Sequence, residues 1–210
     1  MHFITARHLL AKSLFINKCW DEFRFALDES IKAVEPNYFR IKRDHDEPAW
    51  RERAYCYELY HQLRCHLGKD FPYTLHGEID KKNHEVICKE FEEKKCPNPD
   101  FVVHVPGDDK NLLIIEVKLS TSNKERAQRD INKLEIFLKR IRYQYGIFLV
   151  FGSEGDVPKL IEGLTIDEGP ISEGRFCVLW HKNCEELPEV LKGSFQRNNF
   201  QASSKNKGTN

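Results

Sequence analysis

The most informative stretch of the chain is PDFVVHVPGDDKNLLIIEVK, which covers residues 99–118. It holds two runs rich in apolar and β-branched residues, 100–105 and 112–118, separated by the sequence PGDDKN. Because Pro, Gly, Asp and Asn favour tight turns, the two runs are predicted to pair as an antiparallel hairpin. Residues two apart on a strand share a face, so Glu116 and Lys118 are expected to point the same way, with Ile115 and Val117 directed into the core.

Apolar residues on either side of this hairpin repeat with the periods of further helices and strands. Residues 49–67 follow a helical period that ends at Gly68, and Asp46 is the expected N-cap. A second amphipathic helix is predicted from Ser122 or Asn123 to about Tyr143. The other strand-like runs are 75–80, which precedes a turn at 81–84, then 146–152 and 175–181. Because residues 146–152 are apolar throughout, we expect a central strand covered on both faces, in an α/β fold with a mixed central sheet flanked by helices.

The two ends of the chain are expected to lie outside that domain. Apolar residues between 6 and 34 recur at nearly a helical period with a break near Asn17 and Cys19, which predicts one or two helices before Pro36. From Lys192 onward the chain has four basic and no acidic residues and is expected to be disordered. We therefore divide the chain into an N-terminal helical extension at 1–45, a domain at 46–190 and a polar tail at 191–210.

The overall composition excludes some classes of protein. Lys and Arg together number 33, as do Asp and Glu, so net charge gives no general attraction to nucleic acid or to anionic membranes. The seven cysteines form no CxxC pair and are expected to be reduced thiols. The N-terminus lacks a signal-peptide pattern, and no apolar run approaches the roughly 20 residues of a membrane span. These features predict a soluble, cytoplasmic protein.

Between about residues 50 and 152 the predicted elements follow the order helix, three strands, helix, strand. Several charged residues lie at the ends of these elements. Pro99 and Asp100 open one strand, and Glu116 and Lys118 end the next. In this order and with these residues the chain resembles the PD-(D/E)XK nuclease superfamily, which has the fold of type II restriction endonucleases. The resemblance implies a restriction-endonuclease-like αβββαβ core and a metal-dependent nuclease that cuts DNA in preference to RNA.

Asp100 and Glu116 converge if the hairpin pairs as predicted, because they lie near the same end of adjoining strands. Their oxygens, joined by the backbone carbonyl of Val117, suit a hard cation such as Mg²⁺, for which Mn²⁺ is expected to substitute. Such an ion could activate a water, and Lys118 could hold that water or the phosphate. The resemblance implies the same roles and adds Glu58, on the helix at 49–67, as a further metal ligand.

Other residues are weaker candidates for the same site. Glu78 shares a strand face with His76 and Asp80, and we expect it to support the metal site or to line a groove. By the resemblance, Gln128 supports the site through hydrogen bonds. The helix that contains Gln128 has a local excess of basic residues, and phosphate contacts are expected from four of them: Lys124, Arg126, Arg129 and Lys133.

Two other functions stay open from the sequence. One is a catalytically inactive module of the same fold that binds nucleic acid or a protein, and the other is a metal-free interaction protein. A zinc site built from His84, Cys88, Cys96 and His104 is not favoured, because their spacing lacks paired ligands such as CxxC. Members of the superfamily act in host defence, restriction or repair and often dimerise, so the resemblance implies a homodimer, for which the N-terminal helices offer a candidate surface.

Overall fold

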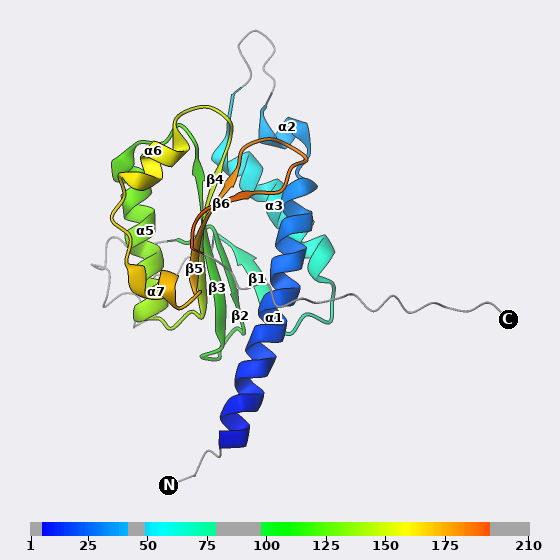
Figure 1. Ribbon diagram of the computed structural model, residues 1–210. Helices are drawn as coiled ribbons and strands as arrows, with labels where there is room; N and C mark the ends of the chain where they lie inside the picture. The colour runs from blue at the N-terminus through cyan, green and yellow to red at the C-terminus, as the bar shows by residue number, and fades with distance from the viewer. Residues whose placement is uncertain (1–5, 42–48, 79–97, 194–210) are drawn as a thin grey trace, which may run out of the picture.

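The computed structural model describes residues 6–41, 49–78 and 98–193, which form a six-stranded sheet covered by helices (Figure 1). The helices are α1 (Ala6–Lys32), α2 (Pro36–Phe39), α3 (Glu52–Leu67), α5 (Lys124–Lys139), α6 (Val157–Glu162) and α7 (Glu168–Ser172). The strands are β1 (Thr74–Gly77), β2 (Phe101–His104), β3 (Asn111–Leu119), β4 (Tyr145–Phe151), β5 (Phe176–His181) and β6 (Glu189–Lys192). The α/β class and the mixed sheet predicted from the sequence are confirmed.

The strands lie side by side in chain order, from β1 to β6. The predicted hairpin is confirmed, because β2 and β3 pair antiparallel with Phe101 opposite Ile115. Strand β1 extends this antiparallel half, and β4 and β5 continue the sheet parallel to β3. Parallel neighbours need a crossover connection, and α5 supplies the one between β3 and β4. The start of β2 and the N-terminus of α5 therefore both lie near the carboxyl end of β3.

Two hydrophobic cores lie on the two faces of the sheet. In Figure 1, α1 and α3 cover one face and α5, α6 and α7 cover the other. Val117 and Leu149 pack into the core on the α1–α3 side, whereas Phe148 packs into the core on the α5 side. Strand β4 is buried from Gly146 to Phe151, which confirms the central strand that its apolar sequence predicted.

The structure corrects two details of the helices. Helix α1 continues through Asn17 without the predicted break, because Trp20 stacks on Tyr145 at 4.0 Å between ring centroids and keeps the helix packed on the sheet. Asp46 is not the N-cap of α3, since that helix begins at Glu52 and its N-cap is Arg51, which makes no side-chain capping bond. Asp46 itself lies outside the described residues, as do Asp80, the turn at 81–84 and the cysteines at 88 and 96.

Some short elements were not expected from the sequence. Helices α6 and α7 have six and five residues, too few for a helical period to show. Strand β6 includes Leu191 and Lys192, which the sequence assigned to the tail; from residue 194 that tail lies outside the described residues. The five cysteines in the described ranges are free thiols, and no helix there is long and apolar enough to cross a membrane.

Candidate active site

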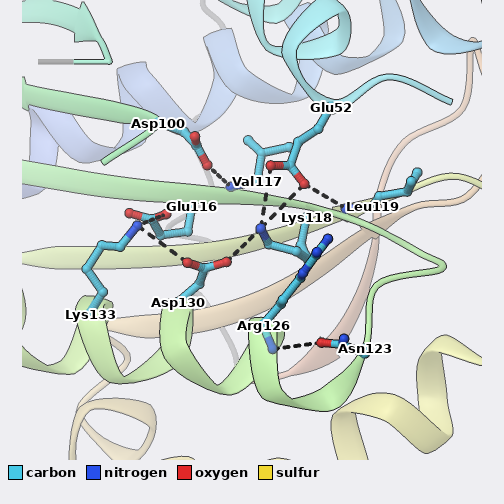
Figure 2. A network of polar contacts seen from close by, with 10 residues as sticks. All are labelled: Glu52, Asp100, Glu116, Val117, Lys118, Leu119, Asn123, Arg126, Asp130 and Lys133. Atoms are coloured by element: carbon cyan, nitrogen blue, oxygen red, sulfur yellow. Dashed lines mark hydrogen bonds and ion pairs between the residues drawn. The ribbon is translucent and has the colours of Figure 1, made fainter. Parts of the chain in front are cut away.

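Asp100 and Glu116 lie at the same end of the β2–β3 pair. Asp100 directly precedes β2, and the pairing of Phe101 with Ile115 makes residues 100 and 116 the next opposed positions. The Asp100 Oδ2 accepts a hydrogen bond of 2.7 Å from the backbone N–H of Val117, which ties the start of β2 to β3 (Figure 2). The predicted convergence of the two acidic residues is therefore present.

Glu116 points from β3 toward α5 and is buried, with only 2% of its surface exposed. Its Oε2 accepts a hydrogen bond of 2.7 Å from the Lys133 ammonium. Its Oε1 is buried and has no hydrogen-bond partner in the described part of the protein. Burial and the nearby negative charge of Asp100 raise the pKa of Glu116 well above its ordinary value, although Lys133 acts in the opposite direction.

Asp100 is perturbed in the same way. Burial raises its pKa from 3.8 to about 6, while the hydrogen bond from Val117 and the charge of Lys133 counteract part of that increase. Two neighbouring carboxyl groups, one buried and one partly buried, that each disfavour ionisation have the electrostatic character of a cation site. A positive charge brought between them would stabilise both carboxylates.

Lys118 leaves β3 on the same face as Glu116, as the two-residue spacing predicted. Its ammonium lies 2.7 Å from Asp130 Oδ2 on α5 and 3.4 Å from Glu52 Oε2 on α3. Burial lowers the pKa of Lys118, but the bond to Asp130 and the charge of Glu52 outweigh it and hold the pKa above its ordinary value. The lysine is therefore charged and fixed from two sides.

Asp130 joins the two lysines of the site. Its Oδ2 contacts Lys118, and its Oδ1 lies 3.4 Å from the Lys133 ammonium. The result is a continuous row of alternating charges that Figure 2 displays across the sheet and α5. From one end to the other the row is Glu52, Lys118, Asp130, Lys133 and Glu116.

Sequence reasoning missed Glu52 and Asp130 and gave Lys133 another role. Glu52 is the first residue of α3, and its carboxylate also accepts a hydrogen bond of 3.3 Å from the Leu119 N–H at the end of β3. Asp130 and Lys133 are three residues apart and so share one face of α5. That spacing was visible in the sequence, but the side of α5 that faces β3 was not.

Glu58 is not brought to this row of charges. It lies six residues after Glu52, which is about 240° around the helix, and its Oε1 accepts a hydrogen bond of 2.6 Å from Gln62. Cys56, one turn after Glu52, is the residue that lies near the acidic cluster. Burial, followed by the charges of Asp100, Glu52, Glu116 and Glu78, raises its pKa well above the ordinary value.

Glu78 and Gln128 lie around the site. The Glu78 N–H donates to the Asp100 carbonyl at 3.0 Å, and its carboxylate is 3.3 Å from Arg53. Gln128 exchanges hydrogen bonds of 2.8 Å with the backbone of Thr165 and so links α5 to the segment after α6. Glu78 thus borders Asp100, whereas the hydrogen bonds of Gln128 to Thr165 support α5 instead.

The four basic residues predicted to contact phosphate divide into two groups. Lys124, Arg126 and Arg129 are exposed on α5, as a phosphate-binding surface requires. Lys133 is half-buried and bound to Glu116 and Asp130. It therefore belongs to the site itself, and its contact with phosphate stays a prediction together with the other three.

The donor set allows a test of whether a hard cation fits. No three His, Cys, Asp or Glu side chains within residues 6–41, 49–78 and 98–193 gather as ligands around one point. Mg²⁺, however, is commonly held by one or two carboxylates, with water and substrate oxygens as its other ligands. Asp100 and Glu116, with the unpartnered Oε1 of Glu116, fit that pattern.

Comparison with known proteins adds no relative. No protein-family model, no curated protein and no solved structure matches this chain.

Proposed function

We propose that this chain is a divalent-metal-dependent nuclease that hydrolyses phosphodiester bonds in nucleic acid, with DNA as its preferred substrate. The proposal depends on one observation, the approach of the Asp100 and Glu116 side chains from adjoining strands beside Lys118. Among the elements of the described residues, the order α3-β1-β2-β3-α5-β4 is also the order that the PD-(D/E)XK resemblance implies. The restriction-endonuclease-like core is part of the same proposal.

Asp100 and Glu116 would hold the metal ion, which is Mg²⁺ or Mn²⁺ from the chemistry of carboxylate ligands. When bound, such an ion supplies a more acidic water and neutralises charge on the phosphate. The backbone N–H of Val117 orients Asp100 through its bond of 2.7 Å. The carboxyl of Glu116 is held by Lys133, which leaves Oε1 as the available oxygen.

Lys118 is the catalytic cation in this proposal. Its ammonium would bind a phosphate oxygen or the attacking water, where a fixed charge needs no reorganisation during the reaction. Asp130 and Glu52 act as positioning residues, because each contacts the ammonium from a different helix. The exposed cations of α5, Lys124, Arg126 and Arg129, would contact the nucleic-acid backbone.

A catalytically inactive binding module of the same fold is the second candidate. The observation that favours it is the pairing of both lysines: Lys133 with Glu116 and Lys118 with Asp130. Buried charges that satisfy one another can serve the fold alone. In that case the exposed basic face of α5 would bind nucleic acid without cutting it.

Cleavage assays distinguish the two functions. We expect the protein to cut plasmid DNA with Mg²⁺ or Mn²⁺, EDTA to stop the reaction, and Lys118→Met to lower the rate about 100-fold or more. Lys124→Met is the matched control, because it removes an exposed lysine at the start of α5 and should cost at most a few-fold.

Binding assays complete the comparison. DNA binding without cutting under either metal would support the inactive module. If the Lys118→Met variant cuts DNA at the wild-type rate, Lys118 has no part in the proposed mechanism.

A further inference from the structure

Two histidines lie together on strands β1 and β2 and take no part in the row of charges. The Nδ1 of His76 and the Nε2 of His104 are 2.9 Å apart, and the ring centroids are 5.1 Å apart at an interplanar angle of 64°. Both rings are partly buried. The sequence placed His104 with His84, Cys88 and Cys96 in a zinc site that it did not favour, and those three lie outside the described residues.

The sheet holds the two histidines in this arrangement. Strands β1 and β2 pair antiparallel, with His76 opposite Val102 and Thr74 opposite His104. His76 and His104 are therefore diagonal neighbours on one face, and long or aromatic side chains can meet at that separation. Val102 belongs to the core on the α5 side, so the pair lies on that side of the sheet near its β1 edge.

The distance between the two nitrogens is close to that of two ligands on one metal ion. Zinc–nitrogen bonds are about 2.0–2.1 Å long, which places two nitrogens of a tetrahedral site about 3.3 Å apart. The observed 2.9 Å differs from that by a few tenths of an ångström, within reach of small ring rotations. One of the two facing nitrogens carries the proton of the hydrogen bond. That nitrogen becomes free to bind a metal when the proton moves to the other nitrogen of the same ring.

We propose that His76 and His104 form a binding site for a transition-metal ion such as Zn²⁺, Ni²⁺ or Cu²⁺. Imidazole nitrogens favour these ions, whereas the carboxylates of Asp100 and Glu116 favour Mg²⁺ or Mn²⁺. The site is thus chemically distinct from the proposed nuclease site and does not depend on nuclease activity. Within the described ranges no third His, Cys, Asp or Glu joins the pair, so the two histidines provide two of the ion's ligands there.

Calorimetric titration of the whole chain with Zn²⁺, in excess Mg²⁺, tests this site. Because the pair supplies half the ligands of a structural zinc site, we expect a dissociation constant for Zn²⁺ on the order of 10 µM. His76→Gln and His104→Gln should each weaken that binding event at least tenfold. His66→Gln is the matched control, because His66 is exposed on α3 and its ring is also hydrogen-bonded.

A footprint on the unmodified chain covers the case in which a variant does not fold. Zn²⁺ should protect His76 and His104 together from diethyl pyrocarbonate, as read by mass spectrometry, and should not protect His66. Zinc affinity that is unchanged in both folded variants, or equal labelling of the two histidines with and without Zn²⁺, would overturn the proposal.

Discussion

The fold disfavours the ionised form of Asp100. Its folded pKa of about 6 lies above the ordinary value of 3.8, so the folded protein binds more protons than the unfolded chain between these values. The stability that Asp100 contributes is fully present below pH 3.8 and is lost as pH rises through 6. The difference of about two units corresponds to up to about 3 kcal/mol at neutral pH.

Asp100→Asn is therefore expected to stabilise the metal-free protein. In EDTA at pH 8 the free energy of unfolding should rise by up to about 3 kcal/mol, and at pH 4 the gain should largely disappear. The amide oxygen can still accept the hydrogen bond from Val117. Urea denaturation at the two pH values measures the effect, and Asp109→Asn, an exposed aspartate in the β2–β3 turn, is the control.

The opposite sign would give Asp100 a different role. A variant that is less stable than wild type at pH 8 would identify the carboxylate as a structural acceptor for Val117. If Asp100→Asn is more stable than wild type without metal, and Mn²⁺ no longer stabilises it, Asp100 behaves as a residue retained for binding a cation.

At the scale of residues, the sequence predicted what strand geometry determines locally. Alternation placed Glu116 and Lys118 on one face, and the hairpin placed Asp100 opposite Glu116, as the structure has them. Glu52 and Asp130 were missed because their positions depend on how α3 and α5 pack on the sheet. The pattern of the resemblance favoured Glu58 on α3, but the rotation of that helix turns Glu52 toward Lys118 instead.

Among the elements, α5 connects the exposed basic surface to the site. Its N-cap is Asn123, whose side chain accepts a hydrogen bond of 3.0 Å from the Arg126 N–H. Asn123→Ala should lower the free energy of unfolding by about 1 kcal/mol. Asp130 and Lys133 lie about two to three turns after the N-cap, so fraying of the first turn should leave Mn²⁺ affinity unchanged.

Thermal and urea denaturation together with metal titration check this separation. Arg129→Ala, an exposed position on the same helix, should change stability by less than about 0.5 kcal/mol. A large loss of Mn²⁺ affinity in Asn123→Ala would show instead that the first turn of α5 takes part in the site.

The elements that the sequence predicted best have a long, regular pattern. Helix α5 and strand β4 were found because apolar residues mark one stripe of the helix and the whole of the strand. Helix α1 was predicted with a break, since residues 10–18 are mostly exposed and residues 19–31 mostly buried, which disturbs the periodic signal. The start of α3 was misplaced because Arg51 provides no capping side chain.

In the whole molecule, α1 extends beyond the body of the protein. It has 27 residues, or about 40 Å of helix, and its dark-blue N-terminal half projects past the sheet in Figure 1. Leu10, Leu14 and Phe25 are exposed by 62%, 60% and 69% on the outer side of this helix. They lie within about 60° of one another around the axis and form a partly apolar stripe.

The charges between these residues favour a second copy of the chain as the partner for this stripe. Lys18 and Asp21 lie on the stripe between Leu14 and Phe25. If two α1 helices pair antiparallel, Leu14 faces the partner's Phe25 and Lys18 faces the partner's Asp21, each twice by symmetry. The homodimer that the resemblance implied is therefore a prediction with a defined geometry.

Sedimentation equilibrium at micromolar concentrations tests that geometry. Phe25→Asp should weaken the dimer about 100-fold, because the symmetry removes two apolar contacts at once. Leu187→Asp, which changes an exposed apolar residue (53%, against 69% for Phe25) in the segment between β5 and β6, should have no effect. Lys18→Asp should weaken the dimer and the double variant Lys18→Asp with Asp21→Lys should restore it, since the swapped charges again face each other. A wild-type chain that is monomeric at 100 times that concentration would exclude this antiparallel pairing. A double variant that dimerises no more tightly than Lys18→Asp would exclude it too. The outer stripe of α1 would then bind another partner.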